Sequence, residues 1–593
     1  MRRPIIRKTC ITNAFPDRDT AIDIKRLFPF LRWKRPTASE FRSDAWAGLS
    51  VGLVLIPQAL AYATLAGMPP ETGLYAALLP SVVGMLWGSS ALLAVGPVAL
   101  TSILVFGSLA PMAAPGSVQW VAMAIWLALY AGVMQFLLGA FKMGKIADLV
   151  SQPVVTGFIN AAAIIILLSQ LPSLSGVQLH PGAWLEGGAA LWTISPAWIL
   201  TSVFGVTALV LLLLIKRLAP HAPGMLITTV LGILGSWLID YAGHGGAIVG
   251  TLPTGLPALS LPPAIPFSSH QELWPAALIL ALISFTEAMS SCRTLARKTN
   301  ARWDENQELI GQGLAKITSG FSGAFPVSGS FSRSALNLYA GAVGPWSSLI
   351  ASACVLLSLY FLTPLIAFLP YSVLAAMIMV PVFNLLDVRA FVRLFRISRD
   401  DGMVALVTLV VTLVCSPRLH FGVFAGVGLT MVSYLYRRTH PRIIEVAAHA
   451  DGTLRDRNRF TLAPIAVHVL AVRIDAAINF LTAAALERFI TDRRNADPAL
   501  RHILICASGV NDIDASGVEM LESLHKTLLA DGLELSLSAV KKQVSDVLER
   551  AGFLARLGNE KMFPTDTVAM ETLSRCMLSA SAQSTAPQKR NTS

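Results

Sequence analysis

Long apolar runs recur through residues 45–436 and leave little choice of fold. A helix that crosses about 30 Å of hydrocarbon needs roughly 20 apolar residues, and the region holds about fourteen such runs. Composition agrees, because 54% of the residues are hydrophobic and only 14% are charged. That balance excludes an ordinary soluble globular protein. The sequence predicts a polytopic α-helical membrane protein.

The formal net charge of +11 does not indicate nucleic acid binding, because the basic residues lie at expected membrane edges. No Lys or Arg occurs between Arg42 and Lys142, or between Arg333 and Arg389. Basic residues gather on the cytoplasmic side of membrane proteins. We therefore expect both termini to be cytoplasmic, in a multi-pass protein of the inner or plasma membrane, with the bilayer as a partner and no nucleic acid.

The chain divides by composition into five parts. The basic start, MRRPIIRKT, is not followed by the continuous apolar stretch of a signal peptide. After Arg438 charges become frequent and no run is long enough to span a membrane. The predicted boundaries are a cytoplasmic N-terminal segment 1–44, a transmembrane domain 45–438, a linker 439–462, a soluble domain 463–575 and a disordered tail 576–593.

Two segments interrupt the apolar pattern at comparable places in its two halves, AVGPVALTS at 94–102 and PVSGSFSRSALN at 326–337. Each places Gly, Pro and hydroxyl residues before a short apolar run, which is the pattern of broken helices around a midplane site in inverted repeats. Two helix N-termini aimed at one point favour an anion. Arg333 adds a fixed cation within the membrane, where charges are costly and usually functional. The alternatives are ordinary re-entrant turns and an arginine that reaches a lipid headgroup.

The first crossing contains Pro57, Gln58 and Tyr62. Proline removes a helix hydrogen bond, and in lipid the freed carbonyl must face protein or a water-lined cavity. Gln58 and Tyr62 are four residues apart and share one helix face. They are candidates for the anion site, and the alternative is a packing kink.

Glu287, in SFTEAMSSCRT at 284–294, is the only acidic residue well inside an expected crossing. A carboxylate in lipid must be neutralised by a proton, a cation or an arginine. We expect Glu287 to couple transport to protons. The alternative is that it only balances Arg333.

These segments resemble the sulfate permease family of anion transporters. The resemblance rests on IPQALAYATLAGMPPETGLYAALLP at 56–80, on NQELIGQGLAKI at 306–317, and on the three segments above, in family order. It implies fourteen helices in a seven-plus-seven inverted repeat with core and gate domains, an elevator-like motion and a homodimer. It assigns Glu287 to cation coupling. The implied substrate-binding residues are Gln58, Tyr62, Pro97, Val98, Ala99, Phe331, Ser332 and Arg333.

One residue departs from the family pattern. Lys316 stands in NQELIGQGLAKI where the family usually has an uncharged polar residue. It either pairs with Glu287 or Glu308 or lies at the cytoplasmic edge. Basic loop residues nearby favour the edge.

The region after the membrane domain alternates strand-like and helical patterns, which indicates a small α/β domain. Expected strands are 465–472, 503–506 and 533–537, and expected helices are 481–491, 516–529 and 544–551. HILICASGVNDIDASGVEML at 502–521 resembles the STAS domain of sulfate transporters and anti-sigma-factor antagonists. Asp514 and Ser516 match its acidic and phosphorylatable positions, and Asp514 is also expected to cap a helix. The implied partners are a cytosolic protein or a nucleotide, and Cys506 departs from the acidic residue often found there.

The chemistry favours secondary transport of an inorganic oxyanion. A single arginine under-compensates a sulfate dianion, which favours a proton entering with it. Sodium-coupled bicarbonate and proton-coupled dicarboxylate transport are the alternatives on the same fold, with Na⁺ as the other coupling ion. A membrane sensor that signals through the STAS domain is the alternative of another class. The scattered cysteines and histidines predict no metal or other cofactor, and no nucleophile-base pair or phosphate loop indicates an enzyme.

Overall fold

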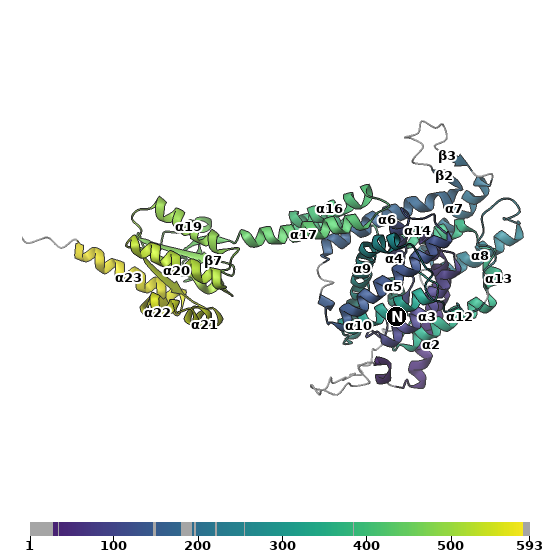
Figure 1. The fold of residues 1–593 in the computed structure, drawn as a ribbon, viewed down its shortest axis with the longest axis horizontal. Coiled ribbons are helices and arrows are strands. Elements are labelled where there is room, and N and C mark those ends of the chain that lie inside the picture. Colours follow the sequence, from purple (N-terminus) through teal and green to yellow (C-terminus); the bar gives the residue numbers. More distant parts are fainter. Residues whose placement is uncertain are drawn as a thin grey trace, which may run out of the picture. The chain divides into compact units, whose positions relative to one another are not determined.

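The computed structural model describes residues 28–33, 35–145, 150–179, 192–194, 197–219, 222–253, 255–383 and 385–584. Most of the predicted N-terminal segment and the last part of the predicted tail lie outside the described residues. The chain forms two compact units, residues 1–430 and 431–593. Figure 1 shows helices throughout the first and a sheet with helices in the second.

Helices of very different lengths build the first unit, from four to 33 residues. Many of their starts have ordinary caps: Thr37 and Glu40 form a reciprocal capping box at the first long helix, which satisfies two of the free amides there. The helices of this unit in the described residues are α2 (Ala38–Leu65), α3 (Glu71–Trp87), α4 (Ala99–Leu109), α5 (Val118–Ala140), α6 (Gln152–Ser175), α7 (Trp198–Leu218), α8 (Gly224–Leu238), α9 (Phe267–Thr299), α10 (Glu305–Phe321), α11 (Phe331–Tyr339), α12 (Trp346–Phe361), α13 (Thr363–Ile366), α14 (Tyr371–Phe383), α15 (Val388–Ile397), α16 (Arg399–Val414) and α17 (His420–Thr439).

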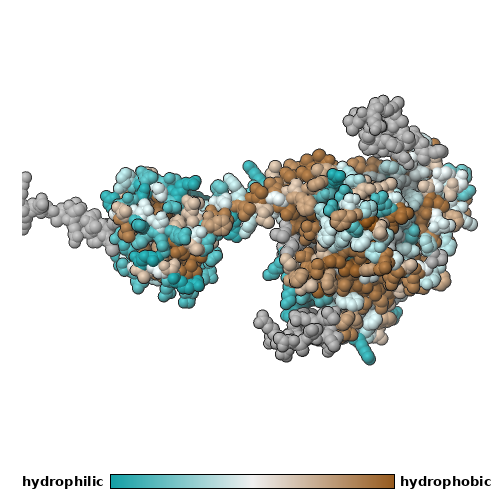
Figure 2. All heavy atoms as spheres, in the orientation of Figure 1, coloured by the Kyte–Doolittle hydropathy of each residue, from teal (hydrophilic) through white to brown (hydrophobic). Residues whose placement is uncertain are grey.

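The surface of this unit suits a bilayer. Among the described residues, six helices or helix pairs are long and apolar enough to cross a membrane, and three shorter helices are apolar. Figure 2 shows hydrophobic residues on much of the outside of the helical unit, whereas hydrophilic residues dominate the surface of the other. On α7 the side chains of Val203, Val206 and Val210 are all more than half exposed. Such apolar faces are stable only against lipid or another apolar surface.

Helix packing repeats between the two halves of the sequence, as an inverted repeat requires. The contact of α2 with α12 has its counterpart in that of α9 with α5, and the contact of α6 with α16 in that of α14 with α7. Helices α2–α5 and α9–α12 pack together as the core domain, and α6–α8 with α14, α16 and α17 form the gate domain. The predicted fold class is confirmed.

A short antiparallel ribbon joins the two halves inside the core domain. Strand β1 (Ala94–Gly96) pairs with β4 (Ser328–Ser330), so that Val95 lies opposite Gly329. Helix α4 begins three residues after β1, and α11 begins directly after β4. At 1.5 Å per residue these helices are only about 16 and 14 Å long, half the hydrocarbon thickness. The ribbon therefore fixes the starts of two half-helices beside each other.

The second unit holds a six-stranded sheet in the order β10-β9-β8-β7-β5-β6. The strands β7 to β10 are parallel, and β5 and β6 are antiparallel additions at one edge. The strands are β5 (Ile443–Ala448), β6 (Leu454–Asp456), β7 (Val469–Ile474), β8 (His502–Cys506), β9 (Glu534–Ser538) and β10 (Met562–Phe563). The helices are α18 (Arg457–Phe460), α19 (Ala483–Ala496), α20 (Ala515–Ala530), α21 (Lys542–Arg550), α22 (Phe553–Leu557) and α23 (Asp566–Ser584).

Two predicted boundaries of this unit are wrong. Residues 439–462 are not a linker, because β5 joins the sheet through hydrogen bonds to β7, with Ile444 opposite Arg473. The predicted tail from residue 576 is helical up to Ser584, because α23 continues through it. Residues 585–593 lie outside the described part. The first predicted strand begins later than expected, at Val469.

Candidate anion-binding site

The two half-helix starts form a concentrated patch of backbone N–H groups. The N-cap of α4 is Val98, which has no side chain able to accept a hydrogen bond. The N-cap of α11 is Ser330, whose hydroxyl accepts a long bond of 3.4 Å from the Arg333 amide and shares another of 3.4 Å with the Ser332 hydroxyl. The first amides of a helix lack intrahelical partners and carry its positive dipole end. Two such ends meet here, so this point attracts negative charge.

Arg333 places a full positive charge between the two half-helices. Its side chain is 1% exposed, and Nη1 donates a 2.8 Å hydrogen bond to the Pro97 carbonyl at the start of α4. Nε and Nη2 have no hydrogen-bond partner among the described residues. Buried donors left unpaired are costly, and a guanidinium matches the two oxygens of an oxyanion. Arg333 thus carries two buried donors without a partner among the described residues.

Small residues keep space beside this guanidinium. A Cβ added to Gly96 would lie 3.2 Å from Arg333 Nη2 and 3.3 Å from Ser81 Oγ. The backbone of Gly96 has φ of +154°, which side-chain-bearing residues rarely adopt. Ser81 in turn donates a 2.8 Å hydrogen bond to the Val95 carbonyl and holds the ribbon to α3. Glycine at this position lets the arginine lie against the ribbon.

The residues predicted on α2 lie in the same unit, and both are buried. Gln58 is 5% exposed, its Nε2 donates to the sulfur of Met225 at 3.1 Å, and its Oε1 is unpaired. Tyr62 is 5% exposed and interacts electrostatically with Arg333 and Glu287. Tyr62 therefore lies near the guanidinium, whereas Gln58 bridges toward α8 of the gate domain.

The other predicted contact residues differ in exposure. Pro97, Val98 and Ala99 are buried at the start of α4, where Pro97 already accepts the arginine bond. Phe331 is 50% exposed and Ser332 is exposed, both in the first turn of α11. The Ser332 hydroxyl and the amides at the start of α11 are therefore accessible to a ligand. The buried residues at the start of α4 mainly form the wall of the site.

Glu287 projects from α9 into the charged environment of the site. Its Oε2 is buried without a hydrogen-bond partner among the described residues, and it interacts electrostatically with Arg333 and Lys316. Among the described residues it forms no hydrogen bond or ion pair with Arg333, although the two side chains interact electrostatically. An unpaired carboxyl at this place has an open position for a proton.

The position of Lys316 corrects a prediction. It does not lie at the cytoplasmic edge but is fully buried in α10, where Nζ donates a 2.9 Å hydrogen bond to Gln135 Oε1. The basic loop residues near it in the sequence suggested the edge, but Gln135 on α5 offers a buried acceptor from 181 residues away. Glu308 is not its partner, because that carboxylate accepts the amides of Ser89 and Ser90.

Sequence reasoning also missed several supporting residues. The Ser334 hydroxyl accepts the Ala94 amide at 2.9 Å, and Ser328 donates to the Ser284 carbonyl at 2.9 Å. Both bonds tie the ribbon to neighbouring helices. Ser334 and Ser328 fall within the hydroxyl-rich motif, which is the only sequence signal that points to them. Ser81 and Gln135 lie in ordinary apolar runs and carry no signal.

In the second unit Asp514 performs the predicted capping. Its carboxylate accepts the Gly517 amide at 2.8 Å and the Phe480 amide at 3.0 Å, which starts α20 and fixes the preceding loop. Ser516 is exposed in the first turn of this helix. Cys506 is buried in β8, and burial raises the pKa of its thiol to about 12. Such a thiol is inert as a nucleophile.

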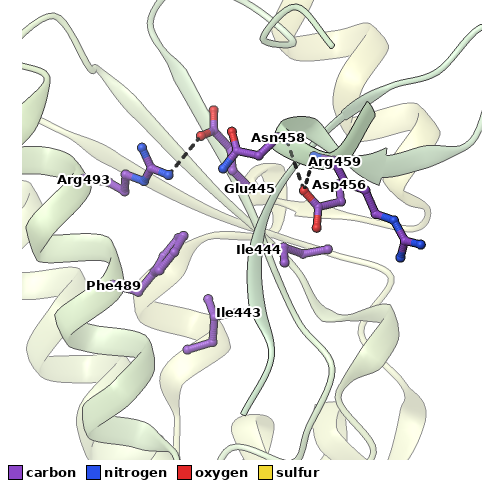
Figure 3. A pocket seen from close by; sticks show the side chains of 8 residues that line it. All are labelled: Ile443, Ile444, Glu445, Asp456, Asn458, Arg459, Phe489 and Arg493. Carbon is purple, nitrogen blue, oxygen red and sulfur yellow. Dashed lines mark hydrogen bonds and ion pairs between the residues drawn. The ribbon is translucent and has the colours of Figure 1, made fainter. Parts of the chain in front are cut away.

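A hollow of about 420 Å³ also lies in the second unit, beside β5 and α19 (Figure 3). The buried Glu445 in it is paired with Arg457 and lies 3.8 Å from Arg493. Its main charges thus compensate one another. Within the described residues no three His, Cys, Asp or Glu side chains gather as a metal site.

Three comparisons place this architecture among known proteins. Residues 41–408 match the model of the sulfate permease family, and residues 462–569 match the STAS domain. A probable sulfate transporter of Mycobacterium tuberculosis is 31% identical over 90% of this chain and 95% of its own length. The murine Solute Carrier 26 family member A9 anion transporter, in an inward-facing state, has the same fold, with a TM-score of 0.83, 22% identity and coverage of 96% and 97%. The transmembrane domain of a cyanobacterium bicarbonate transporter, BicA, gives a TM-score of 0.56 at 22% identity, covering 66% of this chain and 99% of that one.

Fold, broken-helix site and relatives define the class as a multi-pass membrane transporter with a C-terminal STAS domain. More particularly, the chain belongs to the sulfate permease family.

Proposed function

We propose that this protein is a secondary active transporter that takes up sulfate together with protons. The observation that carries the proposal is Arg333, whose Nε and Nη2 have no partner in the described part of the chain although its side chain is 1% exposed. These donors lie between two half-helix N-termini, which together replace part of the hydration of an oxyanion. The names of relatives such as the sulfate transporter of M. tuberculosis favour sulfate as the cargo.

Glu287 is the proposed coupling residue. A sulfate dianion beside one guanidinium leaves negative charge uncompensated, and an ionised Glu287 would add to it. Protonation of its unpaired Oε2 removes that repulsion. The anion and the proton therefore stabilise each other's binding, which is the thermodynamic requirement for symport.

The proposed movement is of the elevator type. The ribbon, Arg333 and Glu287 all belong to the core domain, so this domain would carry the anion past α6, α8 and α14 of the gate domain. Gln58 and Tyr62 on α2 would complete the site together with Pro97, Val98, Ala99, Phe331 and Ser332. With the short α13 and the charged α15 set aside, the remaining helices from α2 to α17 would make up the fourteen of the two repeats, with α4 and α11 each reaching through only about half of the membrane. We also propose cytoplasmic termini, a homodimer, and regulation through Asp514 and Ser516 by a cytosolic partner.

The test is uptake of radiolabelled sulfate into proteoliposomes under an imposed inward proton gradient. We expect the native chain to accumulate sulfate and Glu287→Gln to lose the gradient-driven part while still exchanging sulfate. Arg396→Gln, an exposed position on α15, is the matched control and should transport like the native protein. Absence of sulfate uptake in well-inserted native protein would reject the proposal, and bicarbonate with sodium, then dicarboxylates, would be assayed next.

A further inference from the structure

Lys316 is a buried lysine to which the proposed function gives no role. Its side chain is fully buried in α10, and its ammonium donates one hydrogen bond among the described residues, to Gln135. A neutral donor such as glutamine would make that bond without the cost of burying a charge. The charge itself therefore needs an explanation.

Gln135 fixes this ammonium relative to the anion site. Its Nε2 donates to the Ala281 carbonyl at 2.6 Å and to Ser284 Oγ at 3.1 Å, both on α9. The Ser284 carbonyl in turn accepts the Ser328 hydroxyl of the ribbon. Lys316 is thus held through Gln135 to the same turn of α9 that holds β4.

The charged groups near Lys316 are few. Glu287 stands one helical turn beyond Ser284 and interacts electrostatically with both Lys316 and Arg333. On α10 itself Glu308 is engaged with the amides of Ser89 and Ser90. Helix α5 contains no charged residue, and α3 contains only Glu71 at its start. Lys316, Glu287 and Arg333 therefore set the local charge.

We propose that Lys316 is a specificity-determining residue: it supplies the second positive charge of the anion site, so that the charges of the loaded site sum to zero. This inference rests on the proposed function. The charges of the anion, Arg333, Lys316 and Glu287 can sum to zero in two ways. A dianion with Arg333, Lys316 and a protonated Glu287 sums to zero. A monoanion with both cations and an ionised Glu287 also sums to zero. A dianion thus travels with one proton, and a monoanion travels without one.

A loaded core domain without net charge crosses the membrane field at no electrical cost, whereas each unbalanced charge makes that step depend on voltage. In Lys316→Gln a dianion leaves one negative charge even with Glu287 protonated, whereas a monoanion with a protonated Glu287 still sums to zero. The glutamine introduced at position 316 is long enough to donate a hydrogen bond to Gln135 in place of the lysine. Lys316→Arg keeps the charge.

The experiment measures exchange of labelled external anion for the same unlabelled anion inside proteoliposomes, with equal pH on both sides. Exchange uses only the loaded domain. Labelled sulfate and labelled chloride are the probes, with and without an inside-negative potassium diffusion potential. We expect native exchange of either anion to change less than about twofold with potential. Sulfate exchange by Lys316→Gln should slow about fivefold or more, whereas its chloride exchange should change less than about twofold, because a protonated Glu287 restores the balance. Lys316→Arg should restore the native behaviour.

The outcomes separate this inference from the proposed function. Sulfate uptake with voltage-independent sulfate exchange in Lys316→Gln overturns the role of Lys316 and leaves the proposed function intact. No exchange of either anion by the native chain overturns both. If a variant fails to fold, a measurement on the native chain alone still tests the inference. A pH dye trapped inside the liposomes should report one proton taken up per sulfate. Sulfate uptake without a proton would overturn the proposed charge balance.

Discussion

The start of α11 in the membrane unit and the start of α20 in the STAS domain both present free helix amides beside a charged side chain, but only at α20 does the chain itself satisfy the polar groups. At α20 the Asp514 carboxylate accepts two amides, from Gly517 and Phe480, and so it satisfies the helix end from within the chain. At α11 the cap is a long serine bond, and the nearby Arg333 keeps two donors unpaired. The first arrangement stabilises the fold, while the second leaves its satisfaction to a ligand.

The difference teaches how to separate functional from structural polar groups in this molecule. A satisfied helix start contributes about 1 kcal/mol to stability. An unsatisfied buried donor destabilises the fold by about as much or more. Such a donor persists only where it serves another purpose, such as binding a ligand. Substitution at the two places should therefore affect different measurements: transport at one, local stability at the other.

The largest expected effect follows from removing the unpaired donors. Arg333→Ala should lower saturable sulfate uptake by about 100-fold or more, because two charge-assisted bonds to the anion are lost. Thermal unfolding should change little, because the native side chain makes only one hydrogen bond, to Pro97. Uptake by proteoliposomes and a melting curve in detergent measure the two. Unchanged affinity for sulfate would remove Arg333 from the site.

A smaller effect should follow from filling the space beside the arginine. Gly96→Ala places a Cβ 3.2 Å from Arg333 Nη2 at a backbone angle unsuited to alanine. We expect about tenfold slower uptake, from strain of about 1–3 kcal/mol and a displaced guanidinium. Gly116→Ala is the matched control, because φ is also positive there but nothing lies within 4 Å of the added atom. Equal losses in both variants would show that backbone strain alone is responsible.

The sequence predicted the broken helices well because their signal is local. Gly96, Pro97 and the serines around Arg333 interrupt apolar runs that are otherwise continuous, and two such interruptions in matching places indicate a repeat. The small α/β domain was predictable for the same reason, since its strand and helix patterns alternate within a short stretch.

The errors concern contacts between distant parts of the chain. Lys316 was expected at the membrane edge because its partner Gln135 lies on another helix in an uncharged run. Residues 443–448 were expected in a linker because this strand is specified by its pairing with β6 and β7, which local pattern does not encode. The pairing of β1 with β4 was not predicted either, although it brings the two interruptions together.

On the STAS side the expected change is in stability. Asp514→Ala removes the acceptor for the Gly517 and Phe480 amides and should destabilise the start of α20 by about 1–2 kcal/mol. Hydrogen exchange by mass spectrometry on the full chain should show faster exchange at the start of α20. Asp514→Asn should lose less, because an amide oxygen also caps a helix. A fall in sulfate uptake as large as that of Arg333→Ala would show that the cap takes part in the transport cycle, and that the α20 start does not serve stability alone.

The smallest expected effect is a pH dependence confined to the STAS domain. Burial lowers the pKa of His502, which is 5% exposed in β8 and hydrogen-bonded to Ser536 at 3.0 Å. The unfolded chain then binds the proton more readily than the folded one, so stability is full above the unfolded pKa of about 6.5 and declines as pH falls through the lower folded pKa. After correction for intrinsic rates, amide exchange in β8 should rise by less than about tenfold below pH 6. His502→Gln should flatten this rise, whereas His468→Gln, at an exposed position, should leave it unchanged. An equal rise in the His502→Gln protein would assign the pH dependence to another group. The buried His525 is the first to substitute, since burial lowers its pKa as well.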